Sequence, residues 1–283
     1  MSKNENKVFV NYADFPKDKD GNIYVYRYEP VKYFKENIQK SRLMFSSLRN
    51  WDDRLETRYL KLGKDKLKKD AVGLCFTTEA KINAAAAWGM HKGTSKRTYV
   101  QIKYSLNDLI KGLEQSVQHN VMDFYIRNVE YKDDKEIVKV QPNLAKDLGD
   151  KEFVDLLVQK REDFTYEKEI RIIALGENLL AKKKKFHEIS MGDFLKKAVR
   201  GLKLEPFSAK KVKAKNIPSS REEDDEIQDL MNFVKQNNFE YIKSFNLKKE
   251  GSIVTRSRLY EYGPEYSGKS RKSKKNECKI GSK

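Results

Sequence analysis

The segment from Tyr166 to Leu175 is the strongest strand signal in the chain, because β-branched and apolar residues fill most of it. Side chains alternate between the two faces of a strand, so this segment predicts that Glu167, Glu169 and Arg171 share one face, with neighbours about 7 Å apart. If that face is partly buried, repulsion raises the pKa of one carboxyl group while Arg171 lowers that of the other. The alternative is a solvated face with cross-strand ion pairs.

The remaining segments alternate irregularly between strand and helix patterns, which favours an α+β fold over a doubly wound sheet. The expected fold has mixed, largely antiparallel sheets with flanking helices. The expected strands are Ile23–Tyr28, Leu43–Ser47, Val72–Thr78, Tyr99–Ile102, Asp123–Tyr131, Leu202–Leu204, Phe239–Ser244 and Ser252–Tyr260. The expected helices are Pro30–Gln39, Ala84–Met90, Leu106–Gln118, Glu152–Lys160, Met191–Gly201 and Glu226–Gln236.

The length of 283 residues suits one main domain. We expect an N-terminal extension over residues 1–22, a single α+β domain over 23–262, and a disordered tail over 263–283, where Gly, Ser and Lys dominate. The hydrophobic share is only 38%, but 15 Tyr and 14 Phe provide large buried areas, so a packed core is still expected.

The net charge of +17 attracts polyanions such as nucleic acid, although dispersed lysines also serve solubility alone. Two distant cysteines, Cys75 and Cys278, make no disulfide framework and suggest a reducing compartment. No signal peptide pattern and no long apolar run appear, so a cytoplasmic protein without a membrane span is expected.

Three further places carry chemically useful side chains. Arg27 lies within an aromatic strand, where it either points to solvent or binds an anion. Thr77 and Thr78 end an apolar strand, where hydroxyl groups also commonly cap a turn. The carboxylates of residues 52–56 are suited to a metal ion, or to the start of a helix. The three histidines have no metal-ligand spacing, and phosphate-loop and dinucleotide fingerprints are missing.

The ordered set of these segments resembles a widespread bacterial family known as domain of unknown function 2971. The matching residues are Tyr24–Tyr28, Phe45–Ser47, Trp51–Glu56, Cys75–Thr77, Trp88, Lys160, Phe164, Glu167, Glu169 and Arg171. The resemblance covers roughly residues 23–262 and implies one fold over that range.

The order of an Arg strand, a Thr strand end and a Glu-x-Glu strand is also similar to the Arg–Ser–Glu class of ADP-ribosyltransferases. This resemblance implies an ADP-ribosyltransferase-like core and NAD as the substrate. Glu169 would be catalytic, with Glu167 upstream of it. The second resemblance implies that Arg27, Thr77 and Thr78 contact NAD. Arg171 and Trp88, which match the first family, complete the set of expected cofactor-binding residues.

Three functions therefore compete. The first is an NAD-consuming ADP-ribosyltransferase or NAD glycohydrolase that acts on a nucleic-acid or protein acceptor, in toxicity or phage defence. The second is a metal-dependent nuclease in which Asp52, Asp53, Glu56 and Glu169 hold Mg²⁺. The third is a non-enzymatic nucleic-acid-binding or protein-interaction module. If Arg27, Thr77 and Glu169 line one cleft, the first hypothesis gains strongly, and if they are scattered, it fails.

Overall fold

The structure is a computed structural model that describes residues 7–51, 59–60, 67–78, 98–117, 122–139, 148–179, 185–204 and 221–240. The strands are β1 (Val8–Val10), β2 (Tyr24–Pro30), β3 (Arg42–Ser47), β4 (Asp70–Thr77), β5 (Tyr99–Ser105), β6 (Met122–Asn128), β7 (Glu130–Lys132), β8 (Gln159–Arg161), β9 (Glu169–Gly176), β10 (Phe186–Ser190) and β11 (Val199–Leu204). The helices are α1 (Val31–Gln39), α5 (Leu106–Val117), α6 (Asp134–Lys139), α7 (Asp150–Leu157), α8 (Phe194–Ala198) and α10 (Arg221–Gln236). Short 3-10 helices are η1 (Tyr12–Asp14), η2 (Leu48–Asn50) and η5 (Glu162–Glu167).

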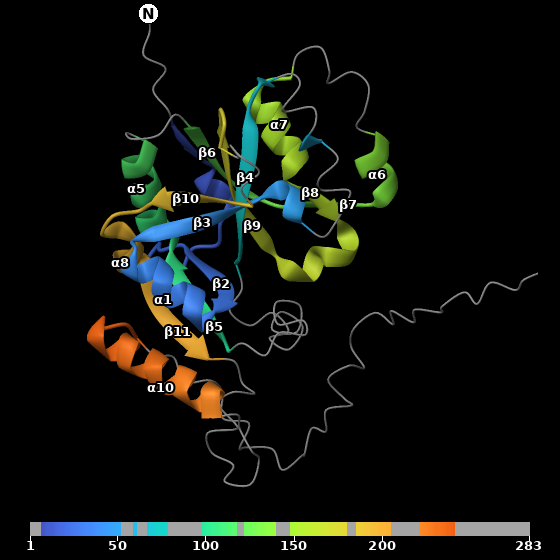
Figure 1. Cartoon of the computed structure of the whole chain (residues 1–283). Helices are drawn as coiled ribbons and strands as arrows, with labels where there is room; N and C mark the ends of the chain where they lie inside the picture. The colour runs from blue at the N-terminus through green and yellow to red at the C-terminus, as the bar shows by residue number, and fades with distance from the viewer. Residues whose placement is uncertain are drawn as a thin grey trace, which may run out of the picture. The chain divides into compact units, whose positions relative to one another are not determined.

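Nine of the described strands form one sheet around β4 and β9 (Figure 1). Its main path runs β1-β6-β9-β4-β2-β5-β11, and β3 pairs with β4 on a side branch that continues to β10. The β1–β6 pair is parallel and the other pairs of this sheet are antiparallel. The expected α+β class with a mixed, mostly antiparallel sheet and flanking helices is therefore confirmed.

Apolar side chains cover both faces of this sheet. On one face, residues such as Val25, Leu74 and Ile172 pack against α1, α5, α8 and α10 in the larger core. On the other face, Ile173 and Leu175 pack against α7 in a smaller core. β9 is buried along its whole length because it lies between these two cores. Any polar side chain on β9 therefore needs a partner from the protein.

Several expected elements form with shifted ends. Strand β2 and helix α1 follow the expectation closely, since Pro30 immediately precedes the first helical residue and presets its backbone. The expected strand Asp123–Tyr131 is two strands, β6 and β7, separated at Val129. The expected helices over 152–160 and 191–201 are shorter, because residues 159–161 and 199–204 pair as β8 and β11.

The expected strand over 166–175 begins only at Glu169. Residues Glu162–Glu167 form η5, and Lys168 has a left-handed backbone with φ of 45°. The prediction that Glu167 lies on the strand beside Glu169 is therefore wrong, because the chain turns before the ladder starts.

The described residues also revise the expected ends of the domain. The segment over 1–22 is not separate from the sheet, since Val8–Val10 pair with Phe124–Ile126. Phe239 and Glu240 lie in neither helix nor strand. The expected helix Ala84–Met90, the rest of the late strands and the tail over 263–283 lie outside the described residues.

Candidate functional site

The sheet divides at β4, and we call this place the fork. β4 pairs with β3 through Val72 and Gly73, but with β2 only through Thr77. Its other edge pairs with β9 without interruption from Asp70 to Thr77. Between the two branches, residues 74–76 have no described strand partner on the side away from β9. A backbone left open in this way needs side chains to satisfy it.

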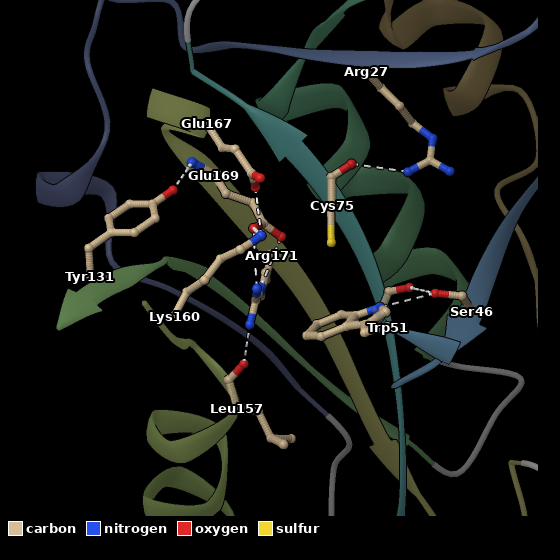
Figure 2. Close-up of polar contacts among 11 residues, drawn as sticks. Arg27, Ser46, Trp51, Cys75, Tyr131, Leu157, Lys160, Glu167, Glu169 and Arg171 are labelled. Atoms are coloured by element: carbon tan, nitrogen blue, oxygen red, sulfur yellow. Dashed lines mark hydrogen bonds and ion pairs between the residues drawn. The ribbon is translucent and has the colours of Figure 1, made fainter. Parts of the chain in front are cut away.

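Arg27 occupies the fork from the β2 side (Figure 2). Its Nη1 donates a hydrogen bond of 3.0 Å to the Cys75 carbonyl oxygen, which belongs to the open stretch of β4. Its guanidinium carbon lies 5.9 Å from the centre of the Phe76 ring, and its Nε is 3.9 Å from Glu29 Oε2. The side chain is 24% exposed, so part of this cation faces solvent.

Glu169 and Arg171 form a paired charge on β9. Arg171 donates from Nε to Glu169 Oε1 at 2.9 Å and from Nη2 to Oε2 at 3.2 Å. Its Nη1 donates to the Leu157 carbonyl oxygen at 2.6 Å, which ties β9 to the end of α7. Arg171 is 0% exposed and Glu169 is 6% exposed. The two-pronged geometry is the strong form of a charged hydrogen bond.

Lys160 joins two carboxylates at the start of β9. Its Nζ lies 2.6 Å from Glu167 Oε2 and 3.0 Å from Glu169 Oε2, and 4.9 Å from the centre of the Phe164 ring. The left-handed turn at Lys168 allows both carboxylates to reach this one ammonium group although they lie on different elements. Glu167 keeps 19% exposure, so the bridge lies where the buried pair meets the surface.

The charge of Glu169 follows from these contacts. Burial opposes ionisation, but Arg171 and Lys160 outweigh it, and the pKa of Glu169 falls to about 2. The expectation that Arg171 lowers the pKa of one carboxyl group is therefore confirmed for Glu169, where Lys160 adds to the effect. Burial, reinforced by the nearby Glu169 charge, raises the pKa of the Cys75 thiol, which stays neutral. Burial also raises the pKa of Tyr131 to about 12, and its hydroxyl accepts from the Glu169 amide at 2.9 Å.

Trp51 closes the site on the β3 side. The Arg171 guanidinium carbon lies 4.2 Å from the centre of the Trp51 ring, and Trp51 Nε1 donates to Ser46 Oγ at 3.3 Å. Gly73 makes this possible, because a Cβ there would lie 2.7 Å from Trp51 Cζ2 and 2.6 Å from Leu48 Cδ2. The indole therefore rests directly on the backbone of β4.

The structure brings Arg27, Thr77 and Glu169 to neighbouring strands, but on two faces of the sheet. Arg27 alternates with Tyr26 and lies on the face of Ile102 and Phe76, whereas Thr77 and Glu169 lie on the face of Tyr26. Thr77 is the register partner of Glu169 on one side and of Tyr26 on the other, next to Arg27. Thr78 lies one residue beyond, and its amide and its hydroxyl donate to the Lys168 carbonyl oxygen at 3.1 and 3.4 Å. The hydroxyl contact corresponds to the turn-capping alternative.

Two predicted residues need correction or fall outside this site. Arg171 does not fit the role of a cofactor contact, because it is fully buried and bound to Glu169 and Leu157. Trp88 lies outside the described residues, as do Asp52, Asp53 and Glu56 of the metal hypothesis. Within the ranges that the structure describes, no group of three or more His, Cys, Asp or Glu side chains is placed to hold a metal ion.

Sequence reasoning did not assign a site role to Gly73, Trp51 or Lys160. A glycine inside an apolar strand marks a close approach to the backbone, and Gly73 could have pointed to a bulky partner. Lys160 matches the first resemblance but carries no local signal of its contact with both carboxylates, because that contact depends on the turn at Lys168.

A surface hollow of about 440 Å³ shares none of these residues. It is lined by Tyr12, Lys17, Gly21, Ile23, Asn107, Ile110, Lys111 and Glu114, at η1 and α5. Across the described segments, no helix combines the length and apolar character needed to cross a membrane.

Comparison with models of known families, with curated proteins and with solved structures gives no match to this chain. The two resemblances above therefore rest on the residues that carry them. The chemistry of the site has to be argued from the fork itself.

Proposed function

We propose that the protein is an NAD-consuming ADP-ribosyltransferase-like enzyme that acts on a macromolecular acceptor. The observation that carries this proposal is the fork. It places the Arg27 strand, the Thr77 strand end and the Glu169 strand side by side, in the order β2-β4-β9. In a transfer of this class, the bond between the ribose C1′ and nicotinamide breaks and nicotinamide leaves with the electron pair. The acceptor then bonds to C1′ and loses a proton, or water does so in a hydrolysis.

The residues at the fork offer separate groups for a pyrophosphate and for a ribose that becomes cationic, with Arg27 reaching the fork from the opposite face of the sheet to Glu169. Arg27 keeps Nη2 without a hydrogen-bond partner among the described residues, and a guanidinium suits phosphate oxygens. Glu169 stays ionised at any ordinary pH, and a fixed carboxylate stabilises a cation that develops in the transition state. Thr77 adds a hydroxyl group beside this carboxylate.

Lys160 and Arg171 have different parts in this proposal. Arg171 is buried behind Glu169 and orients its carboxylate. Lys160 is 11% exposed and contacts Oε2 from the surface side, so it is the cation that leaves when Glu169 faces a substrate. No specific observation favours the nuclease alternative over this function.

The test is Glu169→Gln, which keeps the shape of the side chain and removes its charge. We expect NAD turnover, followed as nicotinamide release, to fall at least about 100-fold while circular dichroism shows a folded protein. The matched control is Glu36→Gln, a glutamate on α1 that pairs with Lys40 and Arg42 away from the fork. Undiminished turnover in Glu169→Gln, or equal losses in both variants, would contradict the proposal.

A further inference from the structure

The β2-β5-β11 branch of the sheet has two unlike faces. One face belongs to the larger core, with Val25, Val100, Ile102, Leu202 and Leu204, and it also carries Arg27, Glu29 and Tyr104. The register places on the other face an aromatic and polar set that we call the tyrosine face: Tyr24, Tyr26, Tyr28, Gln101, Lys103, Ser105, Gly201 and Lys203. Pro30 and Tyr99, which also pair, extend the tyrosine face at one end of this ladder.

The tyrosine face is partly open to solvent. Tyr24, Tyr26 and Lys103 are half-buried, whereas Tyr28 is buried and its hydroxyl accepts from Gln101. The Lys103 ammonium nitrogen lies 3.7 Å from the centre of the Tyr24 ring, so this ring already takes a cation on its face. Flat rings next to a cation are the features that hold a nucleobase and its phosphate.

The tyrosine face leads directly to the candidate catalytic carboxylate. Lys103 on β5 pairs with Tyr26 on β2, Tyr26 pairs with Thr77 on β4, and Thr77 pairs with Glu169 on β9. These four residues form one row across four neighbouring strands, on a single face of the sheet. A ligand on Tyr26 therefore lies beside the residue pair at which the transfer is proposed to occur.

We propose that the tyrosine face binds single-stranded nucleic acid and presents it to Glu169 as the acceptor. One base stacks on Tyr26, and Lys103 moves from the Tyr24 ring to a phosphate, which leaves the Tyr24 ring to a second base. The net charge of +17 complements such a polyanion. An acidic peptide would use the cation but not the flat rings, and the stacked bases of a duplex would not reach them. The acceptor role rests on the proposed function, whereas the binding itself does not.

The experiment measures fluorescence anisotropy of full-length protein with labelled single-stranded DNA and RNA of about 12 nucleotides. It is carried out without NAD, and in both wild type and Glu169→Gln. We expect Tyr26→Leu to weaken binding about tenfold and Tyr26→Phe to retain it, because phenylalanine still stacks. Tyr33→Leu is the matched control, since Tyr33 is an exposed tyrosine on α1, away from the tyrosine face. Thermal melts check that each variant is folded.

A second pair of variants tests the phosphate contact. Lys103→Gln should lower the dependence of log affinity on log salt by about one unit, while Lys40→Gln on the far end of α1 should not. Equal effects of the matched variants, or no effect of Tyr26→Leu, would overturn the proposal. The proposal would also be overturned if NAD displaced the oligonucleotide and Tyr26→Leu lost affinity for NAD. The rings would then hold the base of NAD. Oligonucleotide binding by a protein without NAD turnover would instead overturn the proposed function and leave the tyrosine face standing.

Discussion

Two strands of the sheet each carry a glutamate and an arginine two residues apart, and the two pairs behave in opposite ways. On β9, Arg171 bonds both oxygens of Glu169 at 2.9 and 3.2 Å. On β2, Arg27 Nε lies 3.9 Å from Glu29 Oε2. The Arg27 side chain is instead held at the fork, because its Nη1 donates to the Cys75 carbonyl oxygen. The same spacing therefore gives one closed ion pair and one open one.

As a consequence, the pKa values of Glu29 and Glu169 shift in opposite directions. Burial raises the pKa of Glu29, since the distant Arg27 and a 3.4 Å contact from Asn37 only partly offset it. Burial also opposes the charge of Glu169, but closer cations lower its pKa to about 2. The comparison teaches that two-residue spacing on a strand places two charges on one face. Whether the charges pair depends on whether an unpaired backbone carbonyl, such as that of Cys75, binds the arginine instead. It also identifies Arg27, not Arg171, as the arginine able to bind an anion.

Arg171→Met should be the most destabilising of these changes, because it leaves Glu169 buried without its main partner. We expect a loss of about 3–5 kcal/mol in the free energy of unfolding, measured with urea. Arg27→Met should cost about 1 kcal/mol or less, since Arg27 is partly exposed and Glu29 is already inclined to be neutral. Equal losses of unfolding free energy in Arg171→Met and Arg27→Met would contradict the distinction between a closed and an open ion pair.

The pH dependence of stability should have opposite signs for the two glutamates. The pKa of Glu169 is lowered, so its stabilisation, on the order of 3 kcal/mol, is present above about pH 4.5 and is lost as pH falls toward about 2. The pKa of Glu29 is raised, so its folded state is favoured at low pH and loses stability as pH rises above about 4.5. Urea titrations of Glu169→Gln and Glu29→Gln against wild type measure both slopes, and slopes of the same sign would refute the comparison.

Lys160→Met should have a smaller effect than Arg171→Met, because Arg171 stays in place. We expect a loss of about 1–2 kcal/mol and a rise in the pKa of Glu169 that leaves it below the usual glutamate value. Carbon-13 NMR of the glutamate carboxyl groups measures this pKa directly. Lys69→Met is the control, since Lys69 also bridges two carboxylates, Asp123 and Asp150, away from the fork. An unchanged Glu169 pKa would mean that Lys160 has no part in holding this charge.

The extent to which sequence reasoning succeeds depends on where the deciding contacts lie. β2 and α1 were predictable because Pro30 and the apolar spacing act locally. The pairing of Glu169 with Arg171 on one face follows from strand alternation alone. The start of that strand was not predictable, because residues 166–168 contain no Gly, Pro or Asn that would mark the turn at Lys168.

The contacts that set the start of the strand come from distant parts of the chain. Lys160 bridges Glu167 to Glu169, and the Thr78 amide bonds the Lys168 carbonyl oxygen. β1 was missed for a related reason, since three residues on a parallel edge give no periodic signal. The fork itself depends on which strands pair with β4. Pairing between strands that are distant in the sequence cannot be predicted from a local sequence pattern.

The fork also affects the order in which the chain can assemble. β4 meets β9 about 100 residues later in the sequence, and it meets β2 about 50 residues earlier. Such pairings close long loops before any contact compensates the lost chain entropy, so they form slowly. We therefore expect α1, whose hydrogen bonds are local, to be protected early in pulsed hydrogen exchange, and β9 late. Arg171 and Glu169 would then remain hydrated through most of the folding reaction, and their loss from water would be one of its last steps.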